Sequence, residues 1–376
     1  MTQIPYGHQW IDDADVAAVA EALRSDWLTT GPRVTEFEAA IAAMAGTDGA
    51  VAVSSGTAAL HAAYAAAGVG PGNEVVVPAL TFVATAAAAI HHGATVRFAD
   101  VQEDTGNIDP ASAASLITDA TKVIAAVDYA GHPVDADELA TLAKASDALL
   151  LEDAAHSIGS TSSGRPVGSL ADLTTFSFFP TKNMTTAEGG AVVARDPELL
   201  ERARNYRGHG LVRDPSLQRY PNEGPWHQEV HELGLNYRLP DVLCALGLTQ
   251  LARLETFKAG RRRVFDAYQE GLAGVDGVRL PTKRDDVDPM WHLYPIRVDA
   301  DRRRELFEYL RARGVLVQVN YLPVYWHPWF EDRGYRRGMC PVAEQYYREE
   351  ISLPMYANLS ESDQTRVIDL VRSGLA

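Results

Sequence analysis

Residues 50–153 alternate between short apolar runs and segments whose apolar residues recur at helical spacing, and this rhythm restricts the fold more than any other feature. The strand-like runs are AVAV from residue 50, EVVVP from 74, TVRFAD from 95, KVIAAV from 122 and ALLLED from 148. Helical patterns between them include 82–91, 110–118 and 135–146. Such βα units predict an α/β fold, a mostly parallel sheet with helices on both faces.

Beyond Asp153 the pattern changes to shorter strands. We expect strands at Thr174–Phe178 and Gly190–Ala194, on either side of Lys182, followed by a helix over Glu198–Tyr206. Lys182 should therefore lie on a turn between two strands. Residues 208–235 are rich in Gly, Pro, His and Trp without periodicity, which indicates a long irregular loop of the kind that usually serves a function.

The last third of the chain predicts a second, smaller unit. Pro240–Tyr268 has the spacing of one long helix, and we interpret its basic cluster Arg261–Arg263 as a solvated face. From about residue 275, strands and helices alternate again in HLYPIRV, RRRELFEYLRARG, VLVQVNY, VAEQYYREE, ISLP and a helix over 361–373. We expect a large ligand-binding domain over residues 1–255, with a helical N-terminal segment 1–30, and a small α/β domain over 256–376.

An acidic pair and an isolated lysine carry the chemistry. Glu152 and Asp153 end an apolar run, and His156 follows. Lys182 is one of only five lysines and lies among Phe, Pro, Thr and Gly. Because desolvation lowers the pKa of an amine, such a lysine can act as a nucleophile. We infer a Schiff-base enzyme in which Lys182 carries a carbonyl cofactor and Asp153 holds its ring nitrogen protonated. A surface lysine and a helix-capping aspartate are the alternative.

Other polar and aromatic groups follow the neighbouring strands. Gly56 and Thr57, in SSGTAAL, stand where a strand becomes a helix, an arrangement that binds phosphate but is also an ordinary helix start. Phe82 suits stacking on a planar cofactor or simple core packing, and Ser177 offers a further phosphate contact. Since all of these fall at strand ends, where open α/β sheets bind ligands, they support one another.

Composition excludes several classes of function. The net charge of −16 argues against non-specific binding to nucleic acid or an anionic membrane, so a phosphate ligand must be held locally. Two cysteines and the absence of His or Cys pairs at ligand spacing argue against a disulfide framework and against a metal site. The N-terminus lacks a secretion signal, and the apolar stretch 79–90 is too short to span a bilayer, so we expect a cytoplasmic protein.

Taken together, the motifs resemble a known family. Gly56-Thr57, TFVATA, EDAAHSIGS, FSFFPTKNMTTAEGG, RGHG and GLNYRLPDVLCALGLTQL are similar, in order and spacing, to the DegT/DnrJ/EryC1/StrS family of pyridoxal-phosphate sugar aminotransferases. The resemblance covers essentially the whole chain and implies the aspartate-aminotransferase-like fold, fold type I. YGHQWIDDADV, AAVDYAGHPV and VQVNYLPVY resemble the branch that aminates C4 of UDP-4-keto-6-deoxy-N-acetylhexosamines for pseudaminic-acid-type sugars.

This resemblance assigns roles to the candidate residues. It implies that Lys182 holds pyridoxal phosphate in a Schiff base, that Asp153 pairs with the pyridinium nitrogen, that Phe82 stacks on the ring and that His156 lies near the phenolic oxygen. The phosphate would be held by Gly56, Thr57 and Ser177. Asn236 would reach the phosphate of a partner subunit, which implies a homodimer with a shared active site.

The implied reaction is transamination in two half-reactions, from an amino acid, expected to be glutamate, to a nucleotide-linked keto sugar. Lys182, once displaced by the donor amine, would move the proton between Cα of the substrate and C4′ of the cofactor. A local basic and aromatic surface for the donor carboxylate or the nucleotide diphosphate is offered by Arg207, His209, Trp226 and Arg238. Ordinary loop charges are the competing interpretation of these four.

Departures from the family pattern concern the sugar. Many members of the C4-aminating branch have histidine in place of Phe179 and of Asn320. Neither side chain supplies the same proton chemistry, although other members carry phenylalanine before Pro-Thr-Lys. His327 is a substitute candidate for the pocket, but a histidine in such a Trp-rich loop is more often structural.

Three alternatives stay open at this point. The substrate is another keto sugar or cyclitol, such as a dTDP-linked sugar of an antibiotic or cell-surface glycan pathway. Alternatively, the chain is a cofactor-dependent sugar dehydratase, against which Lys182 argues because the family's dehydratases replace it with histidine. The last alternative is a regulatory member that binds cofactor or sugar without turnover.

Overall fold

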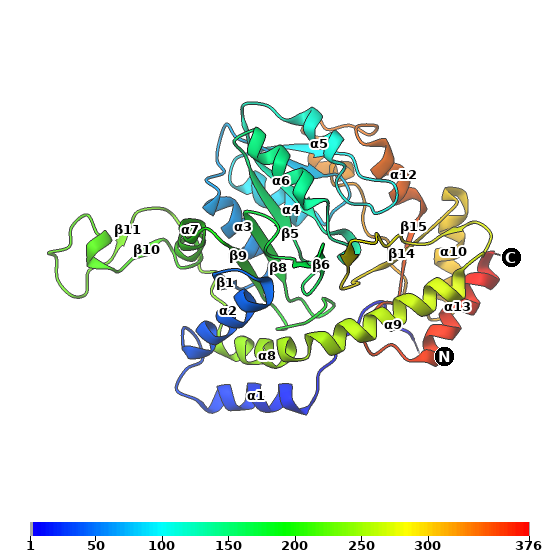
Figure 1. Cartoon of the computed structure of the whole chain (residues 1–376), viewed down its shortest axis with the longest axis horizontal. Coiled ribbons are helices and arrows are strands. Elements are labelled where there is room, and N and C mark those ends of the chain that lie inside the picture. Colours follow the sequence, from blue (N-terminus) through cyan, green and yellow to red (C-terminus); the bar gives the residue numbers. More distant parts are fainter. Residues whose placement is uncertain (1–2, 376) are drawn as a thin grey trace.

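A seven-stranded sheet forms the centre of the molecule in the computed structural model, which describes residues 3–375 (Figure 1). The strand order is β1-β9-β8-β5-β4-β2-β3. Strands β8, β5, β4, β2 and β3 run parallel, whereas β9 is antiparallel to both β8 and β1. The bounds are β1 Gly49–Val53, β2 Glu74–Pro78, β3 Thr95–Ala99, β4 Thr121–Val127, β5 Leu149–Asp153, β8 Leu173–Ser177 and β9 Gly190–Ala194. The predicted α/β architecture is confirmed.

Both faces of the sheet are buried, which explains why its strands are apolar throughout. Alternate residues of a strand point to opposite faces, so Val51 and Val53 pack on one side and Ala50 and Ala52 on the other. The first face is covered by α3 (Gly56–Ala66), α4 (Ala84–His91) and α7 (Pro197–Arg207). The second is covered by α2 (Pro32–Ala45), α5 (Pro110–Leu116), α6 (Ala136–Ala145) and α8 (Asp241–Ala252).

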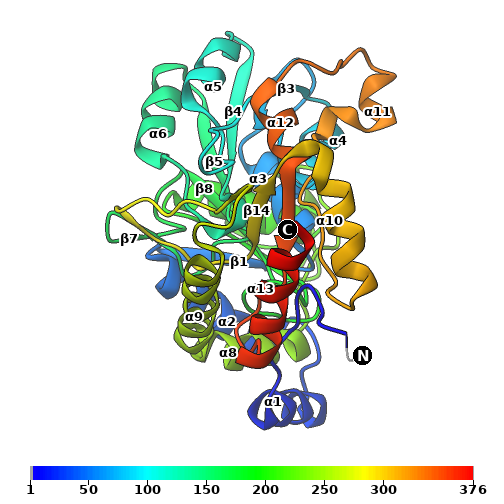
Figure 2. The same cartoon turned by 90° about the vertical axis from the view of Figure 1, so that its right-hand side faces the viewer.

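A third core lies in the C-terminal part of the chain (Figure 2). A small antiparallel sheet, β12-β14-β15, packs there with α9, α10 and α13. The bounds are α9 Leu254–Leu272, β12 Val278–Arg279, β14 Tyr294–Val298, α10 Ala300–Ala312, β15 Glu350–Leu353 and α13 Glu361–Leu375. Helix α9 begins in the second core, with Leu254, and continues into the third, so a boundary near residue 255 stays a prediction.

The remaining elements are short or peripheral. Helix α1 packs on α8, whereas α11 and α12 lie in the segment between α10 and β15. A three-stranded sheet β13-β6-β7 and a two-stranded sheet β10-β11 complete the fold. Their bounds are α1 Asp13–Arg24, β6 Thr161–Ser162, β7 Arg165–Pro166, β10 Leu211–Val212, β11 Glu229–Val230, β13 Val287–Asp288, α11 Pro328–Glu331 and α12 Pro341–Glu349. Within residues 3–375, no helix combines the length and hydropathy needed to cross a bilayer.

Two expected elements are wrong. The single helix over Pro240–Tyr268 is two helices, because Arg253 leaves helical geometry at φ −103° and ψ 9° between α8 and α9. Its guanidinium pairs with Asp12 and Asp15 of α1. The expected strand VLVQVNY is extended backbone with only two isolated bridges, Ile4–Val315 and Gln318–Ser352, and its end turns toward the central cavity described below.

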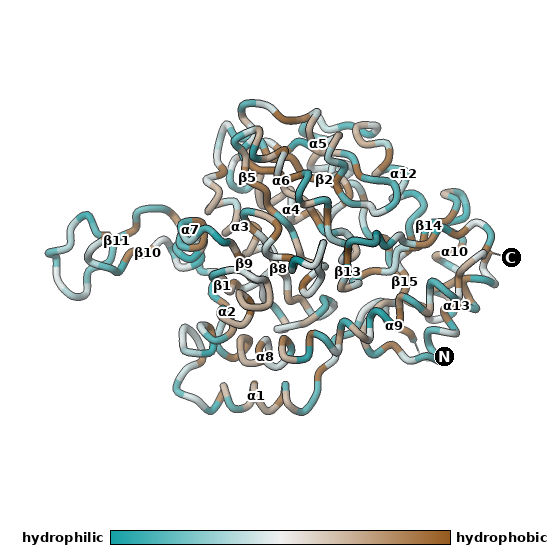
Figure 3. Tube along the Cα trace, in the orientation of Figure 1, coloured by the Kyte–Doolittle hydropathy of each residue, from teal (hydrophilic) through white to brown (hydrophobic). Residues whose placement is uncertain are grey.

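Residues 208–235 project away from the body as an arm (Figure 1). Apart from the short β10-β11 pair and one 3-10 turn at Pro215–Leu217 the arm is irregular, as predicted. The tip of the arm is hydrophilic (Figure 3). The arm nevertheless carries two exposed apolar side chains, Trp226, 79% exposed, and Leu233, 89% exposed. Its root is fixed, since Leu235 N donates to Tyr206 O at 2.8 Å and Tyr237 N to Arg207 O at 3.0 Å.

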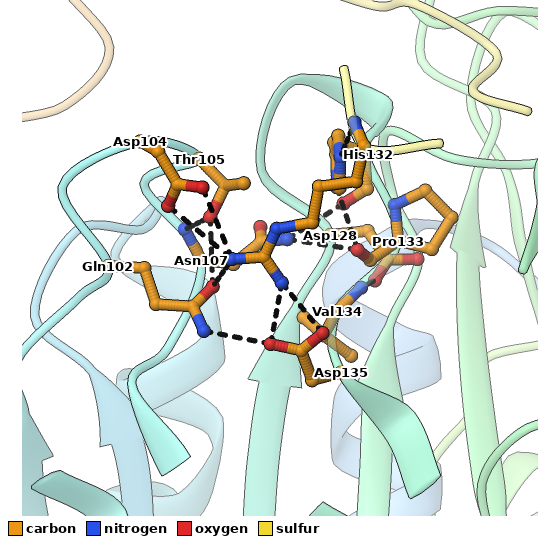
Figure 4. A network of polar contacts seen from close by, with 10 residues as sticks. Gln102, Asp104, Thr105, Asn107, Asp128, His132, Pro133, Val134 and Asp135 are labelled. Atoms are coloured by element: carbon orange, nitrogen blue, oxygen red, sulfur yellow. Dashed lines mark hydrogen bonds and ion pairs between the residues drawn. The ribbon is translucent and has the colours of Figure 1, made fainter. Parts of the chain in front are cut away.

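A polar network ties the segment before β13 to the loops that follow β3 and β4 (Figure 4). Arg284 donates to both oxygens of Asp135, at 2.7 and 2.8 Å, and to Gln102 at 2.9 Å. Asp104 lies 3.3 Å from the same guanidinium. These contacts hold the start of the C-terminal part against the central sheet. Of the two loops, only the one after β4 belongs to a neighbour of β5, the strand that ends at Asp153.

Candidate active site

A cavity of about 330 Å³ opens at the carboxyl ends of the parallel strands. It is lined by residues from the end of β5, the turn after β8, the start of α3 and the loop before α4. The C-terminal segment around residues 292 and 320 closes another side. Among the predicted residues it brings together Gly56, Thr57, Phe82, Asp153, His156, Ser177, Phe179, Lys182 and Asn320.

Lys182 lies on the turn between β8 and β9 and lines this cavity. The turn is closed by Lys182 N, which donates to Phe179 O at 2.9 Å, and by Thr186 N, which donates to Phe178 O at 3.0 Å. Burial lowers the pKa of the Lys182 amine to about 8, although the nearby Asp153 carboxylate works in the opposite direction. A substantial fraction of the amine is therefore neutral near physiological pH, as a nucleophile requires.

Asp153 is the buried last residue of β5, and its carboxylate lines the cavity. Its Oδ2 accepts a hydrogen bond from Thr85 Oγ1 at 2.7 Å. Burial raises the pKa of Asp153, against the opposing effects of the Thr85 hydrogen bond and the Lys182 charge. A buried carboxylate with one hydroxyl partner can still accept a hydrogen bond from a cationic donor. Glu152 faces the other side of the sheet, where it accepts from Thr174, and does not line the cavity.

The start of α3 supplies an anion cradle. Ser55 caps the helix by accepting from Ala58 N at 3.0 Å, and Gly56 and Thr57 begin it at the cavity wall. A Cβ on Gly56 would stand 2.7 Å from Ser177 Cβ, so only glycine allows the helix start to approach β8 this closely. Backbone N–H groups, hydroxyls and the positive helix end then converge on one point, which suits a phosphate.

Two histidines and a tyrosine form the floor opposite the cradle. The centroids of the His156 and His292 rings are 4.4 Å apart, with the ring planes tilted by 36°, and the Tyr321 hydroxyl lies 3.1 Å from His156 Nε2. Burial lowers the pKa of both imidazoles well below the usual value, so both are neutral. Each has a buried Nδ1 without a hydrogen-bond partner among the described residues. Phe82 stands across from Tyr321 with ring centroids 6.0 Å apart.

Asn320, next to Tyr321, also lines the cavity and is held by two hydrogen bonds. Tyr6 donates to Asn320 Oδ1 at 3.0 Å, and Asn320 N donates to Glu350 Oε2 at 2.7 Å. Burial raises the pKa of Glu350 to about 8, so this carboxyl is protonated at neutral pH. With its oxygen occupied by Tyr6, the Asn320 amide has its NH₂ group to offer.

Several predicted residues lie outside this cavity. Asn236 is exposed at the root of the arm, near Arg238. Arg207 pairs with Glu38 and donates to Ala52 O at 2.9 Å. Arg207 and Arg238 line a separate pocket of about 200 Å³, between α2 and α7. His209, Trp226 and His327 lie on the arm or at the start of α11, away from the cavity of their own chain.

Some residues that line the cavity were not singled out by the sequence analysis. Thr85 and Ser55 are ordinary helix-start residues, and His292 follows a buried tryptophan. Tyr6 and Asn320 meet across 314 positions of sequence. Of these residues, Thr85 could have been predicted from the sequence. It follows β2, and the carboxyl ends of parallel strands such as β2 and β5 lie at the same edge of the sheet.

The donor set fits a phosphorylated aromatic aldehyde. The helix start at Gly56 carries no side chain, because a Cβ has no room there. The backbone of this cradle can bind the phosphate. Among the described residues, neither oxygen of Asp153 has a cationic hydrogen-bond partner. Lys182 offers a primary amine, and Phe82 offers an exposed ring face. Within residues 3–375, no cluster of three or more His, Cys, Asp or Glu side chains has the arrangement of a metal site.

Comparison with known proteins gives one family over nearly the whole chain. The model of the "DegT/DnrJ/EryC1/StrS aminotransferase family" matches residues 9–372. The spore coat polysaccharide biosynthesis protein SpsC of Bacillus subtilis is 38% identical over 98% of this chain and 96% of its own length. A UDP-4-amino-4,6-dideoxy-N-acetyl-beta-L-altrosamine transaminase of Campylobacter jejuni is 37% identical, over 98% and 97%. A dTDP-3-amino-3,4,6-trideoxy-alpha-D-glucose transaminase of Streptomyces venezuelae is 38% identical, over 95% and 90%.

Solved structures agree with the family match. The putative sugar aminotransferase Spr1654 of Streptococcus pneumoniae, in its PMP form, superposes with a TM-score of 0.93 and 30% identity over 99% of both chains. Helicobacter pylori PseC, an aminotransferase of pseudoaminic acid biosynthesis, superposes with a TM-score of 0.92 and 32% identity over 100% of this chain and 99% of its own. The similarity therefore extends to the C-terminal part as well as to the sheet.

Proposed function

Because this chain belongs to the DegT/DnrJ/EryC1/StrS aminotransferase family, we propose that it transfers the amino group of L-glutamate to C4 of a UDP-linked 4-keto-6-deoxy-N-acetylhexosamine. The protein is a pyridoxal-phosphate-dependent sugar transaminase, and the proposal concerns the sugar, the donor and the residues that act. Similarity to the altrosamine transaminase and to PseC supports the choice of sugar.

One observation carries the assignment of the residues: Lys182, with its lowered pKa, shares a cavity with the buried Asp153 and the Gly56–Thr57 cradle. Lys182 is the covalent anchor of the cofactor. The cradle, with Ser55 and Ser177, binds its phosphate, and Asp153 holds a proton on its ring nitrogen. Phe82 covers one ring face, and His156 orients the phenolic oxygen.

The residues then divide the proton work. The bound cofactor supplies an electron sink and carries nitrogen between the two half-reactions. Lys182 Nζ, once released, would act as the base that moves a proton between Cα of the amino donor and C4′ of the cofactor, and would move it in the opposite direction when the sugar is aminated. Its lowered pKa suits both directions, because a base near neutrality accepts and returns a proton at similar cost.

The sugar end of the site is built by Phe179 and Asn320. Phe179 is partly exposed on the lysine turn and offers an apolar contact. The Asn320 amide, held by Tyr6, offers a hydrogen-bond donor that does not titrate. The remaining cationic and aromatic candidates, Arg207, His209, Trp226, Arg238 and His327, lie outside the cavity of their own chain, and we assign them no contact within it.

A dTDP-linked keto sugar is the second candidate. Its support is specific: the Streptomyces venezuelae dTDP-sugar transaminase is as similar in sequence as the UDP-sugar enzyme. Asn320 adds to this support, since many members of the UDP-sugar branch carry histidine there.

A substrate panel distinguishes the two candidates. The purified enzyme, loaded with pyridoxal phosphate, should absorb visible light and should lose this band when glutamate is added. Restoration of the band by UDP-linked or dTDP-linked keto sugars then reports the second half-reaction, and NMR of the product locates the amine. We expect a preference for the UDP-linked 4-keto sugar of at least about tenfold in kcat/KM. A larger response to the dTDP-linked sugar would replace the proposed substrate.

Replacement of Lys182 tests the anchor. Lys182→Ala should abolish multiple turnover, while some pyridoxal phosphate still binds. The loss of the covalent link is measured by mass spectrometry after borohydride reduction. A variant with full activity would refute the role of Lys182.

We further propose a homodimer in which the root of the arm serves the cavity of the partner. Asn236 is exposed and distant from its own cavity, and the arm carries exposed apolar residues such as Trp226 and Leu233. Helix α1 adds Val16 and Leu23, about 60% exposed, on the body. A dimer would bury these apolar groups.

Subunit mixing tests the shared site. Asn236→Asp should repel the cofactor phosphate, so it and Lys182→Ala should each be inactive as pure dimers. If Asn236 acts in the partner's cavity, mixed dimers contain one site without either change and regain activity. Mixtures that stay inactive, or a monomer in sedimentation equilibrium, would contradict the arrangement.

A further inference from the structure

Arg261 is a buried cation without a carboxylate partner. It lies on α9, and only 2% of its surface is exposed, although a solvated face was predicted for Arg261–Arg263. In the part of the chain that the structure describes, every acceptor of its guanidinium is a main-chain carbonyl, and its Nε has no acceptor. Burying a guanidinium in this way is unfavourable, and burial lowers its pKa to about 10. Such an arrangement calls for a compensating role.

The four carbonyls come from three separate segments. Nη1 donates to Trp291 O at 3.0 Å, to Met355 O at 3.2 Å and to His292 O at 3.5 Å. Nη2 donates to Lys182 O at 3.4 Å. The planar fork of a guanidinium can hold several acceptors in fixed relative positions, which a lysine ammonium does not. One side chain therefore joins the lysine turn to the segment that carries His292.

A neighbouring contact acts in the same direction. Asn183, next to Lys182, donates from its side-chain amide to Met290 O. The stretch from Met290 to His292 thus contacts the lysine turn twice, and its His292 ring lies against the His156 ring in the cavity wall, tilted by 36°. The position of the Lys182 amine consequently depends on contacts from the C-terminal part of the chain, outside the central sheet.

We propose that Arg261 is a positioning residue for Lys182: its guanidinium fixes the main-chain carbonyls of Lys182 and His292 relative to each other and so sets where the amine stands in the cavity. This role rests on the proposed function of Lys182 as the anchor. Arg261 itself does not line the cavity, so it acts through the backbone of Lys182 rather than by contact with the cofactor.

The test compares Arg261→Met with Lys258→Met as a matched control. Lys258 is a second buried cation on α9 and also donates to a main-chain carbonyl, Gly159 O at 2.8 Å, but it does not contact the lysine turn. Both variants should lose thermal stability. Only Arg261→Met should slow the covalent capture of pyridoxal phosphate at Lys182, by about tenfold to a hundredfold, measured by borohydride reduction and mass spectrometry of the tryptic peptide.

A second readout needs no cofactor. In the apoprotein, amide hydrogen exchange in the peptide 178–186 should accelerate in Arg261→Met and remain at the wild-type rate in Lys258→Met. Arg261→Lys should fall between wild type and Arg261→Met in both measurements, because it keeps the cation and loses the fork. It carries the test if Arg261→Met does not fold.

The outcomes separate this role from the proposed function. Capture and exchange at wild-type rates in Arg261→Met or in Arg261→Lys would overturn the positioning role, as would an equal loss in Lys258→Met. Wild-type protein that captures no pyridoxal phosphate at Lys182 would overturn the proposed function, and the positioning role with it.

Discussion

Two carboxylates near the carboxyl ends of the neighbouring strands β5 and β4 each have a cation nearby, yet the pKa values of the two sets shift in opposite directions. In the cavity, burial raises the pKa of Asp153 and lowers that of Lys182 to about 8. At the edge of the molecule, burial acts on Asp135 and Arg284 in the same sense, but their mutual hydrogen bonds outweigh it, so the pKa of Asp135 falls and that of Arg284 rises. The edge pair is shown with its neighbours in Figure 4.

The difference follows from water and hydrogen bonds. Asp135 bonds to Arg284 through both oxygens and also accepts from Gln102, and both partners are partly solvated. Asp153 receives only a hydroxyl and a weak backbone contact, in a nearly dry wall. A satisfied ion pair holds structure, whereas an unsatisfied one retains free energy for binding a ligand and moving a proton.

The sharpest contrast should come from replacing each aspartate by asparagine. Asp153→Asn removes the charge that would hold a proton on the cofactor ring, and we expect turnover to fall by about 10²-fold to 10⁴-fold. Asp135→Asn should leave turnover unchanged and lower stability by about 1 kcal/mol or less. Steady-state kinetics of the two variants at equal cofactor loading decides the matter, and equal losses in both would remove the distinction between the pairs.

An effect of intermediate size is expected from pH. Because only the neutral amine reacts, capture of pyridoxal phosphate by the apoenzyme should rise with pH around a midpoint near 8. A free lysine has a pKa of about 10.4, so a midpoint near that value would show that Lys182 is not desolvated. Stopped-flow absorbance from about pH 6.5 to about pH 10.5, a range that includes both values, measures the midpoint.

The same shift has a consequence for stability with a definite sign. The folded apoenzyme favours neutral Lys182, while the unfolded chain keeps the ordinary, higher pKa. The contribution of Lys182 to the free energy of unfolding is thus fully present above the unfolded pKa and is lost as pH falls toward about 8. Lys182→Met should flatten this part of the pH profile.

The smallest effect belongs to the edge pair. Arg284→Met should cost about 0.2–1 kcal/mol of unfolding free energy, and the cost should shrink as salt is added because the charges are screened. Urea unfolding at low and high ionic strength measures both quantities, with Arg284→Lys as a control that keeps the charge. A loss of several kcal/mol that salt does not change would mean that this pair is as dry as the cavity.

The regular part of the fold could be predicted because it depends on local patterns. The βα rhythm located the strands β1 to β5, and the residues after them converged in space since parallel strands end at one edge. The antiparallel direction of β9 was not predicted, because an apolar strand reads the same in both directions. The break at Arg253 was also missed, since one non-helical residue hardly disturbs a helical pattern.

Prediction of the site was limited by contacts between distant segments. Asp153, Lys182 and the Gly56 cradle were visible through residue type and strand ends. Tyr6 meets Asn320 because Ile4 packs in the C-terminal core. In the sequence Arg261 does not differ from its solvated neighbours, and only the fold gives it carbonyl acceptors. Sequence periodicity describes neighbours along the chain, so it cannot say which distant carbonyl a buried cation will reach.

The arm described above leaves the body and returns to it at adjacent points, where Tyr206, Arg207, Leu235 and Tyr237 exchange main-chain hydrogen bonds. A segment with such a closed root can change in length or sequence at its tip without strain on the sheet behind it. Residues 211–230 are therefore the natural place for evolution, or for a protein engineer, to change the length or sequence of the arm while the central sheet keeps its geometry.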